Sequence, residues 1–255
     1  NVGVENLKEK AGFIAHEFYG KPSEALWMCG VTGTNGKTTC SQWIGAGLSQ
    51  KGEKPAVAGT LGAGFPAQLN PVANTTPDAL ELHSMLKDFR TQGATAAAME
   101  VSSHGLDQGR VNGVAFDCAL FTNLTHDHLD YHGSMQAYGE AKAKLFEVAG
   151  LETAVLNLDD PFGRELARRT GARVIGYGIS DSSGHLFAER IGEKKIKIRT
   201  GSESVEISFP HVGAFNLSNA LGVLGCLLAR GLSLPEGAPL LSKLPPVPGR
   251  MQTVG

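Results

Sequence analysis

The segment Gly33-Thr34-Asn35-Gly36-Lys37-Thr38-Thr39 constrains the fold of this chain more than any other. It follows an apolar run from Ala25 to Val31 and precedes a stretch of helical character that ends near Gln50. A glycine-rich turn between a strand and a helix lets backbone N–H groups converge on phosphate oxygens, and the helix N-terminus adds its positive end. The segment therefore predicts a phosphate-binding loop, with Lys37 on the β- and γ-phosphates and the Thr38 hydroxyl on Mg²⁺.

The loop departs from the general G-x-x-x-x-G-K-[ST] pattern at one position. Val31 stands where that pattern has glycine, and Gly30 comes one residue too early. An ordinary strand–turn–helix corner with an exposed lysine is the alternative interpretation. Because a strand precedes the loop, a helix follows it and Gly-Lys-Thr-Thr is intact, nucleotide binding is favoured.

Apolar runs and helical patterns alternate along the rest of the chain, which predicts an α/β fold with a mostly parallel, doubly wound sheet. Further strands are expected at 55–59, 94–101, 116–122, 154–158 and 174–177. Helices are expected at 5–20, 77–91, 134–149, 161–170, 215–230 and 236–243. Thr76 is the expected N-cap of the helix at 77–91, with Pro77 in its first turn. Three short alternating segments within 185–209 predict a small antiparallel sheet.

This pattern divides the chain into three parts. Residues 1–24 are expected to be a helix and linker, residues 25–244 one nucleotide-binding domain, and the proline-rich residues 245–255 a second linker. The chain begins with Asn1 rather than Met, and both ends are expected to be cuts from a longer protein.

Composition narrows the choice of partners and compartment. Lys and Arg number 23 against 25 Asp and Glu, so no basic field favours nucleic acid or an anionic membrane. No stretch reaches the roughly 18 apolar residues of a membrane span, and the start does not resemble a signal peptide. Four cysteines without a C-x-x-C pair are expected to be free thiols in a reducing cytoplasm.

Four further motifs accompany the phosphate loop. They are Asn74-Thr75-Thr76-Pro77-Asp78, Met99-Glu100-Val101-Ser102-Ser103-His104-Gly105-Leu106, Thr122-Asn123-Leu124-Thr125-His126-Asp127-His128-Leu129-Asp130-Tyr131-His132 and Gly213-Ala214-Phe215-Asn216-Leu217-Ser218-Asn219. In order and spacing, and over nearly the whole chain, they resemble the Mur ligase family, and within it the tripeptide synthetases. The related folylpolyglutamate synthetases are the closest alternative, and the first two motifs speak against them.

The resemblance implies a function and an organisation. A tripeptide synthetase uses ATP to join an amino acid to UDP-N-acetylmuramoyl-L-alanyl-D-glutamate through an acyl phosphate, in peptidoglycan synthesis. The chain would be the central ATP-binding domain of a monomeric, cytoplasmic enzyme, and alone it is expected to be inactive because the flanking domains hold much of the substrate sites. The added amino acid, whether diaminopimelate, lysine or another, stays open.

The resemblance also assigns the residues of the site. Lys37, Glu100, His128 and Lys142 are the catalytic group, and two Mg²⁺ ions are expected on Thr38, Glu100, His128 and Lys142. The nucleotide is expected on Gly33, Thr34, Asn35, Gly36, Lys37, Thr38, Thr39, Asn216, Asn219 and Arg250. The UDP-muramoyl dipeptide is expected on Asn74, Thr75, Thr76, Ser102, Gln108 and Arg110.

Several of these residues have plainer interpretations. Glu100 could face water at a strand end, and Arg110 could be an ordinary surface residue. Asn216 and Asn219 could cap the helix near residue 215, and Arg250 could belong to a linker.

Lys142 falls in the middle of an apolar stripe on the predicted helix at 134–149, between Tyr138 and Leu145. An unpaired ammonium in such a place is costly. In the Mur ligases the matching lysine is carbamylated by CO₂ and helps to hold the second Mg²⁺. The alternative is that the stem packs while the ammonium reaches solvent.

His126, His128 and His132 form a dense cluster with two aspartates. Alone, such a cluster could bind zinc and indicate a hydrolase, since imidazole and carboxylate are usual zinc ligands. The H-x-H-x-D-H pattern of metallo-hydrolases nearly fits, but Tyr131 follows Asp130, so the register fails. For His126 and His132, a solvated polar loop is the favoured interpretation.

Overall fold

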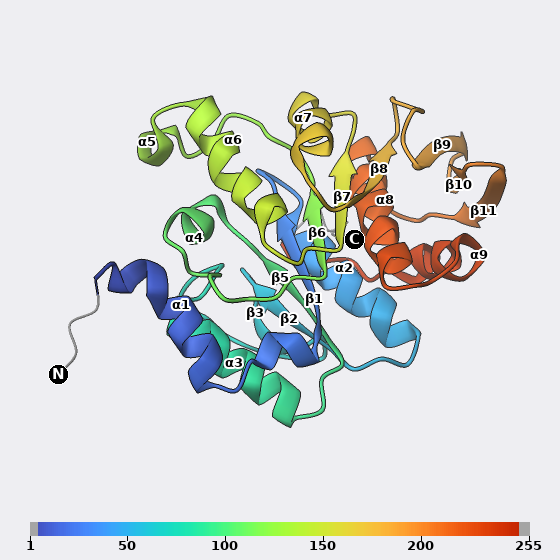
Figure 1. The fold of residues 1–255 in the computed structure, drawn as a ribbon. Helices are drawn as coiled ribbons and strands as arrows, with labels where there is room; N and C mark the ends of the chain where they lie inside the picture. The colour runs from blue at the N-terminus through green and yellow to red at the C-terminus, as the bar shows by residue number, and fades with distance from the viewer. Residues whose placement is uncertain (1–4, 250–255) are drawn as a thin grey trace.

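The computed structural model describes residues 5–249, and one mixed sheet of eleven strands runs through this part of the chain (Figure 1). The strand order is β11-β10-β9-β8-β7-β6-β1-β5-β2-β3-β4. Its parallel centre consists of β2 (Pro55–Gly59), β5 (Ala96–Glu100), β1 (Trp27–Thr32), β6 (Cys118–Phe121), β7 (Thr153–Asn157) and β8 (Arg173–Gly178). The prediction of a mostly parallel sheet is confirmed.

Further strands, with mostly antiparallel pairing, extend both edges of this sheet. The predicted segments at 185–209 are β9 (Leu186–Gly192), β10 (Lys195–Thr200) and β11 (Glu203–Ser208). They are antiparallel to one another, but β9 pairs in parallel with β8, so they continue the main sheet. At the other edge, β3 (Gly62–Phe65) and β4 (Gln68–Asn70) were not predicted. Their glycine-rich sequence lacks the β-branched residues that mark a strand.

Helices cover both faces of the sheet, as a doubly wound fold requires. On one face lie α2 (Lys37–Gln50), α8 (Ala214–Ala229) and α9 (Leu234–Gly237), followed by a 3-10 helix, η3 (Ala238–Lys243). The other face carries α3 (Ala79–Thr91), α4 (Ser103–Asp107), α6 (Met135–Ala143) and α7 (Pro161–Arg169), and α1 (Leu7–Phe18) packs on α3. A hydrophobic core lies on each face of the sheet, and successive side chains of β1 point to opposite faces. Cys29 therefore packs in one core and Met28 in the other.

The predicted cap of α3 was wrong. Asp78 is the N-cap, and its carboxylate accepts from the N–H groups of Leu80 and Glu81, at 3.0 Å each. Thr76 is unable to serve because its hydroxyl donates to the Glu100 carbonyl oxygen at 3.0 Å. The helix therefore begins after Pro77 rather than at it.

Other boundaries also differ from the predicted ones, and 3-10 helices account for the clearest of these differences. The helix expected at 134–149 is α6, capped by Ser134, followed by a 3-10 helix, η2 (Lys144–Glu147). A 3-10 helix, η1 (Pro22–Ala25), occupies the start of the first apolar run, so β1 begins at Trp27.

The last described residues pack against the domain although they lack regular structure. The Pro245 carbonyl accepts from the Trp43 indole N–H at 2.8 Å, and Val247 is buried. The four cysteines are free and buried, as expected. Between residues 5 and 249, every helix is too short or too polar to cross a bilayer.

Candidate active site

A cavity of about 890 Å³ opens where β1, β5 and β6 end, at the carboxyl edge of the parallel sheet. Open α/β sheets bind their ligands at this edge. Most predicted site residues line it: Thr34, Asn35, Gly36, Lys37, Thr38, Thr39, Asn74, Thr75, Thr76, Glu100, Ser102, Arg110, His128, Lys142, Asn216 and Asn219. Gly33 and Gln108 are not among the lining residues, and Arg250 lies outside the described residues.

The phosphate loop needs glycine at two positions. Gly33 and Gly36 have φ of 143° and 88°, which other residues rarely adopt. A Cβ at Gly33 would lie 1.9 Å from the Thr122 hydroxyl, and one at Gly36 would lie 2.5 Å from the Asn219 amide oxygen. The loop is thus closely packed between the segment after β6 and the start of α8.

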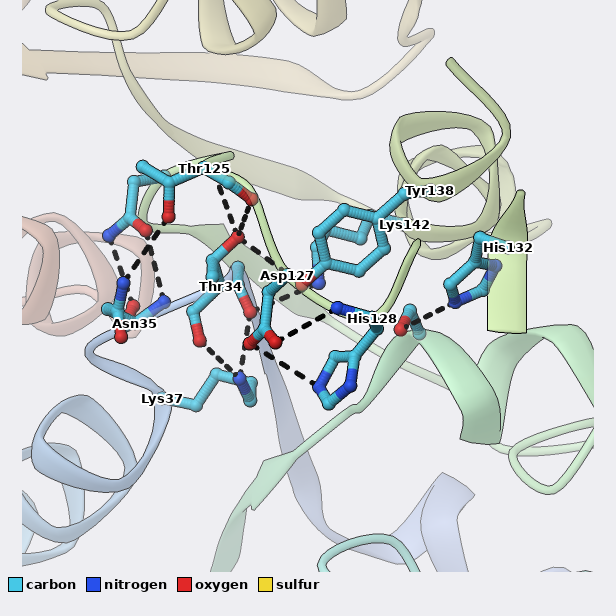
Figure 2. A network of polar contacts seen from close by, with 12 residues as sticks. Thr34, Asn35, Lys37, Thr125, Asp127, His128, His132, Tyr138 and Lys142 are labelled. Atoms are coloured by element: carbon cyan, nitrogen blue, oxygen red, sulfur yellow. Dashed lines mark hydrogen bonds and ion pairs between the residues drawn. The ribbon is translucent and has the colours of Figure 1, made fainter. Parts of the chain in front are cut away.

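The segment after β6 holds the loop through backbone contacts that the sequence analysis did not assign. The Asn123 carbonyl accepts from the Thr34 N–H at 2.8 Å, and its side-chain oxygen accepts from the Asn35 N–H at 3.0 Å. The Thr122 hydroxyl donates to the Asn35 carbonyl at 2.5 Å. The Thr34 hydroxyl donates to the Thr125 carbonyl at 3.2 Å (Figure 2). Thr122, Asn123 and Thr125 belong to the motif at 122–132, of which the sequence analysis had considered only the histidines and aspartates as functional.

Lys37 curls back over the loop that precedes it. Its ammonium donates to the carbonyl oxygens of Gly33 and Thr34, at 2.8 Å each (Figure 2). Lys37 is the first residue of α2, so its positive charge and the positive end of the helix act on the same part of the cavity.

Glu100 is buried, only 1% exposed, which rules out the water-facing interpretation. One carboxylate oxygen accepts from the Thr38 hydroxyl at 3.0 Å, and the other accepts from the Thr60 N–H at 2.7 Å. The ion pairs among residues 5–249 do not include Glu100. A buried carboxylate whose hydrogen-bond donors are neutral gains from a cation. Hydroxyl and carboxylate oxygens suit Mg²⁺, so this pair fits the predicted ion.

Lys142 is also 1% exposed, so its ammonium does not reach bulk solvent as the alternative required. It donates to the Gly33 carbonyl at 3.1 Å and lies 4.2 Å from the centre of the Tyr138 ring (Figure 2). Burial, and then the nearby charge of Lys37, lowers the pKa of Lys142 from 10.5 to about 6. At neutral pH the side chain is therefore mostly an uncharged amine.

The three histidines of the third motif do not converge on one point. His128 is half-exposed and lines the cavity, His132 turns to the Ser103 hydroxyl at 3.0 Å, and His126 is exposed. Within the described part of the chain, the only group of three or more potential ligands close enough for one metal is Cys29, Cys118 and Cys226, buried in the core. The zinc-hydrolase alternative thus loses its geometric basis.

Among the residues expected to hold the dipeptide, Arg110 is held in place rather than loose on the surface. Its guanidinium donates to the Thr76 carbonyl at 2.8 Å and twice to the Gln108 side-chain oxygen, at 2.9 and 2.7 Å. Gln108 therefore orients Arg110 instead of lining the cavity itself. The Thr76 hydroxyl lies 3.1 Å from that of Ser102, which joins the two motifs.

On the α8 side, Asn219 is buried beside Gly36, and the Asn216 amide donates to the Val212 carbonyl at 2.7 Å. The N-cap of α8 is Gly213, without a side-chain cap, so neither asparagine is its N-cap. Eight residues line the cavity without having been assigned: Thr60, Ser103, His104, Asn123, Thr125, Tyr138, Phe215 and Gly249.

Comparison with known proteins agrees with the family resemblance found in the sequence. Residues 31–227 match the model of the Mur ligase middle domain. The protein of Chromobacterium violaceum named UDP-N-acetylmuramoyl-L-alanyl-D-glutamate–2,6-diaminopimelate ligase is 46% identical over 260 residues, which cover 100% of this chain and 53% of that protein. The chain thus spans about half the length of the curated relatives it matches.

Solved structures agree. A structure of a ligase with the same name has a TM-score of 0.89 and 33% identity, and the match covers 100% of this chain and 55% of that one. A bifunctional folylpolyglutamate synthase/dihydrofolate synthase has a TM-score of 0.74 at 21% identity, covering 100% of this chain and 66% of that one, which shows a shared fold alone. With its phosphate loop, its motifs and this match over most of its length, the chain belongs to the Mur ligase family and contains that family's middle domain.

Proposed function

We propose that this chain is the ATP-binding part of a ligase that joins 2,6-diaminopimelate to UDP-N-acetylmuramoyl-L-alanyl-D-glutamate in peptidoglycan synthesis. One observation carries the proposal: a single cavity contains both the phosphate loop and the residues expected to hold the dipeptide, with Glu100 between them. The named relatives, similar over the whole chain, supply the amino acid. We place the enzyme in the cytoplasm and expect it to act as a monomer.

The proposed chemistry has two steps, because a carboxylate is a poor electrophile. The terminal carboxylate of the dipeptide attacks the γ-phosphorus of ATP, and the bond to ADP breaks, which gives an acyl phosphate. The amine of the incoming amino acid then attacks the acyl carbon, loses a proton and displaces phosphate. Lys37 and the start of α2 stabilise the negative charge on the transferred phosphoryl group.

Four residues would hold two Mg²⁺ ions beside the phosphates: Thr38 and Glu100 the first, His128 and Lys142 the second. The ions would neutralise phosphate charge during transfer. An amine ligates a hard cation poorly, but the uncharged Lys142 can add to CO₂, giving a carbamate and releasing one proton. Carbamylation needs an unprotonated amine, so the pKa of about 6 for Lys142 supports this step.

Arg110 is the residue we expect to bind an anionic group of the dipeptide. Its contacts with Gln108 and the Thr76 carbonyl fix the guanidinium plane at the wall of the cavity. A guanidinium held in this way loses little conformational entropy when it binds a carboxylate or phosphate.

The test is ADP release by the complete protein supplied with ATP, Mg²⁺ and a pair of substrates. We expect release with the muramoyl dipeptide plus diaminopimelate, and none with a folate plus glutamate. Release with the folate pair alone would overturn the proposal, and lysine in place of diaminopimelate tests the choice of amino acid. Residues 1–255 alone are expected to bind Mg-ATP without forming an amide.

A further inference from the structure

His128 lies in a backbone conformation that its own sequence does not favour. It has φ of 51° and ψ of 28°, in the left-handed region, immediately before the four-residue helix α5 (Leu129–His132). A residue other than glycine costs roughly 1–2 kcal/mol there, and so short a helix is unstable by itself. The Asp127 carboxylate lies 3.5 Å from the His128 ring and accepts from the His128 N–H, and the contacts of α5 with the rest of the domain are the further support for the ring.

Two hydrogen bonds join α5 to α4. The His132 ring nitrogen Nε2 lies 3.0 Å from the Ser103 hydroxyl, and the Tyr131 hydroxyl donates to the Asp107 carboxylate at 3.0 Å (Figure 2 shows the His132 contact). Ser103 is the first residue of α4 and Asp107 the last. The two bonds thus attach α5 to both ends of α4.

Between these bonds, the His104 ring contacts α5 and His128 together. Its centre lies 4.1 Å from that of Tyr131 and 5.0 Å from that of His128, the latter with the rings nearly perpendicular at 88°. Edge-to-face aromatic contacts at this spacing are worth roughly 0.5–1.5 kcal/mol. His104 also lines the cavity, so this group of rings forms part of its wall.

At its N-terminal end, α4 is also joined to the strand that carries Glu100. Only Val101 and Ser102 separate Glu100 from α4, and Ser102 caps the helix through the Gly105 N–H at 3.0 Å. The Thr76 hydroxyl lies within hydrogen-bond distance of both the Glu100 carbonyl and the Ser102 hydroxyl. A continuous set of contacts therefore runs from Glu100 through α4 to His128.

We propose that Ser103, His104 and Tyr131 are positioning residues, which hold His128 at a fixed place relative to Glu100. The proposal rests on the proposed function only for the identity of the ions that the two residues would hold. Mg²⁺ tolerates little error in ligand geometry, so weaker support for His128 lowers affinity at the second Mg²⁺ position. The first position, on Thr38 and Glu100, keeps its own ligands.

The experiment compares Ser103→Ala, Tyr131→Phe and their combination in the complete protein. Ser103→Ala removes the His132 bond, and Tyr131→Phe keeps the ring on His104 while removing two hydrogen bonds of its hydroxyl, the one to Asp107 and the one that the Gln108 amide donates at 3.4 Å. Lys144→Gln is the matched control, because Lys144 contacts the same Asp107 at 3.1 Å, is half-exposed and does not touch α5.

The first readout is backbone hydrogen exchange, which needs neither metal nor turnover. In the double variant, exchange should quicken in a peptide spanning 127–133, where the His132 and Gly133 N–H groups bond within α5. Peptides covering 33–39 and α8 should stay at the wild-type rate. Wild-type protection of 127–133 in the double variant would overturn the proposal, whether or not the protein is a ligase.

The second readout is the Mg²⁺ concentration that gives half-maximal turnover. Loss of the residues that support a metal ligand typically weakens metal affinity by about 10–100-fold, so a rise of at least about tenfold is expected in the double variant. The nucleotide affinity of the double variant should equal that of wild type. The Lys144→Gln protein should have the wild-type Mg²⁺ requirement. Faster exchange with an unchanged Mg²⁺ requirement would show that α4 supports α5 without positioning a metal ligand, and would overturn that part.

Discussion

The ammonium nitrogen of Lys142 lies 3.1 Å from the carbonyl oxygen of Gly33, the first glycine of the phosphate loop. A lysine from α6 thus reaches the same carbonyl that Lys37 contacts at 2.8 Å. Burial, and then the positive charge of Lys37 on the same acceptor, disfavour the charged form of Lys142 and keep its pKa at about 6. The protonation of Lys142 therefore depends both on pH and on what binds at the phosphate loop.

Stability should therefore rise with pH because of Lys142. Its pKa is about 6 in the folded protein and near 10.5 when unfolded, so the unfolded chain binds more protons between these values. The free energy of unfolding then gains up to about 1.4 kcal/mol per pH unit from this group. Urea unfolding of the Lys142→Met protein at pH 7 and pH 9, without CO₂, should show a smaller rise than wild type. Lys144→Met, at an exposed lysine, should keep the wild-type slope, and equal slopes in all three proteins would contradict the assignment.

Removing the Lys142 side chain should also remove a chemical function that a small molecule can replace. We expect Lys142→Ala to lose nearly all ligase activity in the complete enzyme and to regain part of it with added acetate or formate. Lys144→Ala should keep its activity and show no response to these anions. A failure of rescue, together with no CO₂ adduct on the native lysine by mass spectrometry, would count against carbamylation.

Lys37 should matter for chemistry and not for folding. Its ammonium donates to the loop carbonyls of Gly33 and Thr34, and α2 is anchored by buried residues such as Trp43 and Ile44. Lys37→Ala should lower acyl-phosphate formation by at least about 100-fold, as the loss of a charge-stabilising group does. Its circular dichroism and melting temperature should resemble those of wild type. Turnover within a few-fold of wild type would refute the role.

Local sequence patterns were enough to place the phosphate loop and the parallel strands, whereas most of the other residues of the cavity wall were assigned through the resemblance to the Mur ligases. Gly33, Gly36 and Lys37 lie where strand–loop–helix geometry puts them. The hydrogen bonds that Asn123 accepts from the Thr34 and Asn35 N–H groups were not predictable, because they join residues far apart in the chain.

Thr76 shows why side-chain roles were harder to predict than elements. From the sequence it looked like a helix cap, since threonine before Pro77 fits that pattern. In the structure a long-range bond to the Glu100 carbonyl takes its hydroxyl, and Asp78 caps the helix instead. The helix α5 was not predicted either. It has only four residues, which is too short for a hydrophobic periodicity to be seen in the sequence, and it follows His128, whose backbone is left-handed.

Gly59 offers a test of Glu100 that leaves the carboxylate itself in place. A Cβ at Gly59 would lie 2.1 Å from a Glu100 carboxylate oxygen, so Gly59→Ala must push that side chain away from Thr38 and Thr60. We expect Mg²⁺-dependent nucleotide affinity to fall by about tenfold or more, since displaced metal ligands have effects of that order. Gly171→Ala is the control, because a Cβ there meets nothing within 4 Å. Calorimetric titration with ATP, with and without Mg²⁺, measures the effect. An unchanged Mg²⁺-dependent affinity in the Gly59→Ala protein, with its fold intact, would mean that Glu100 does not hold the ion.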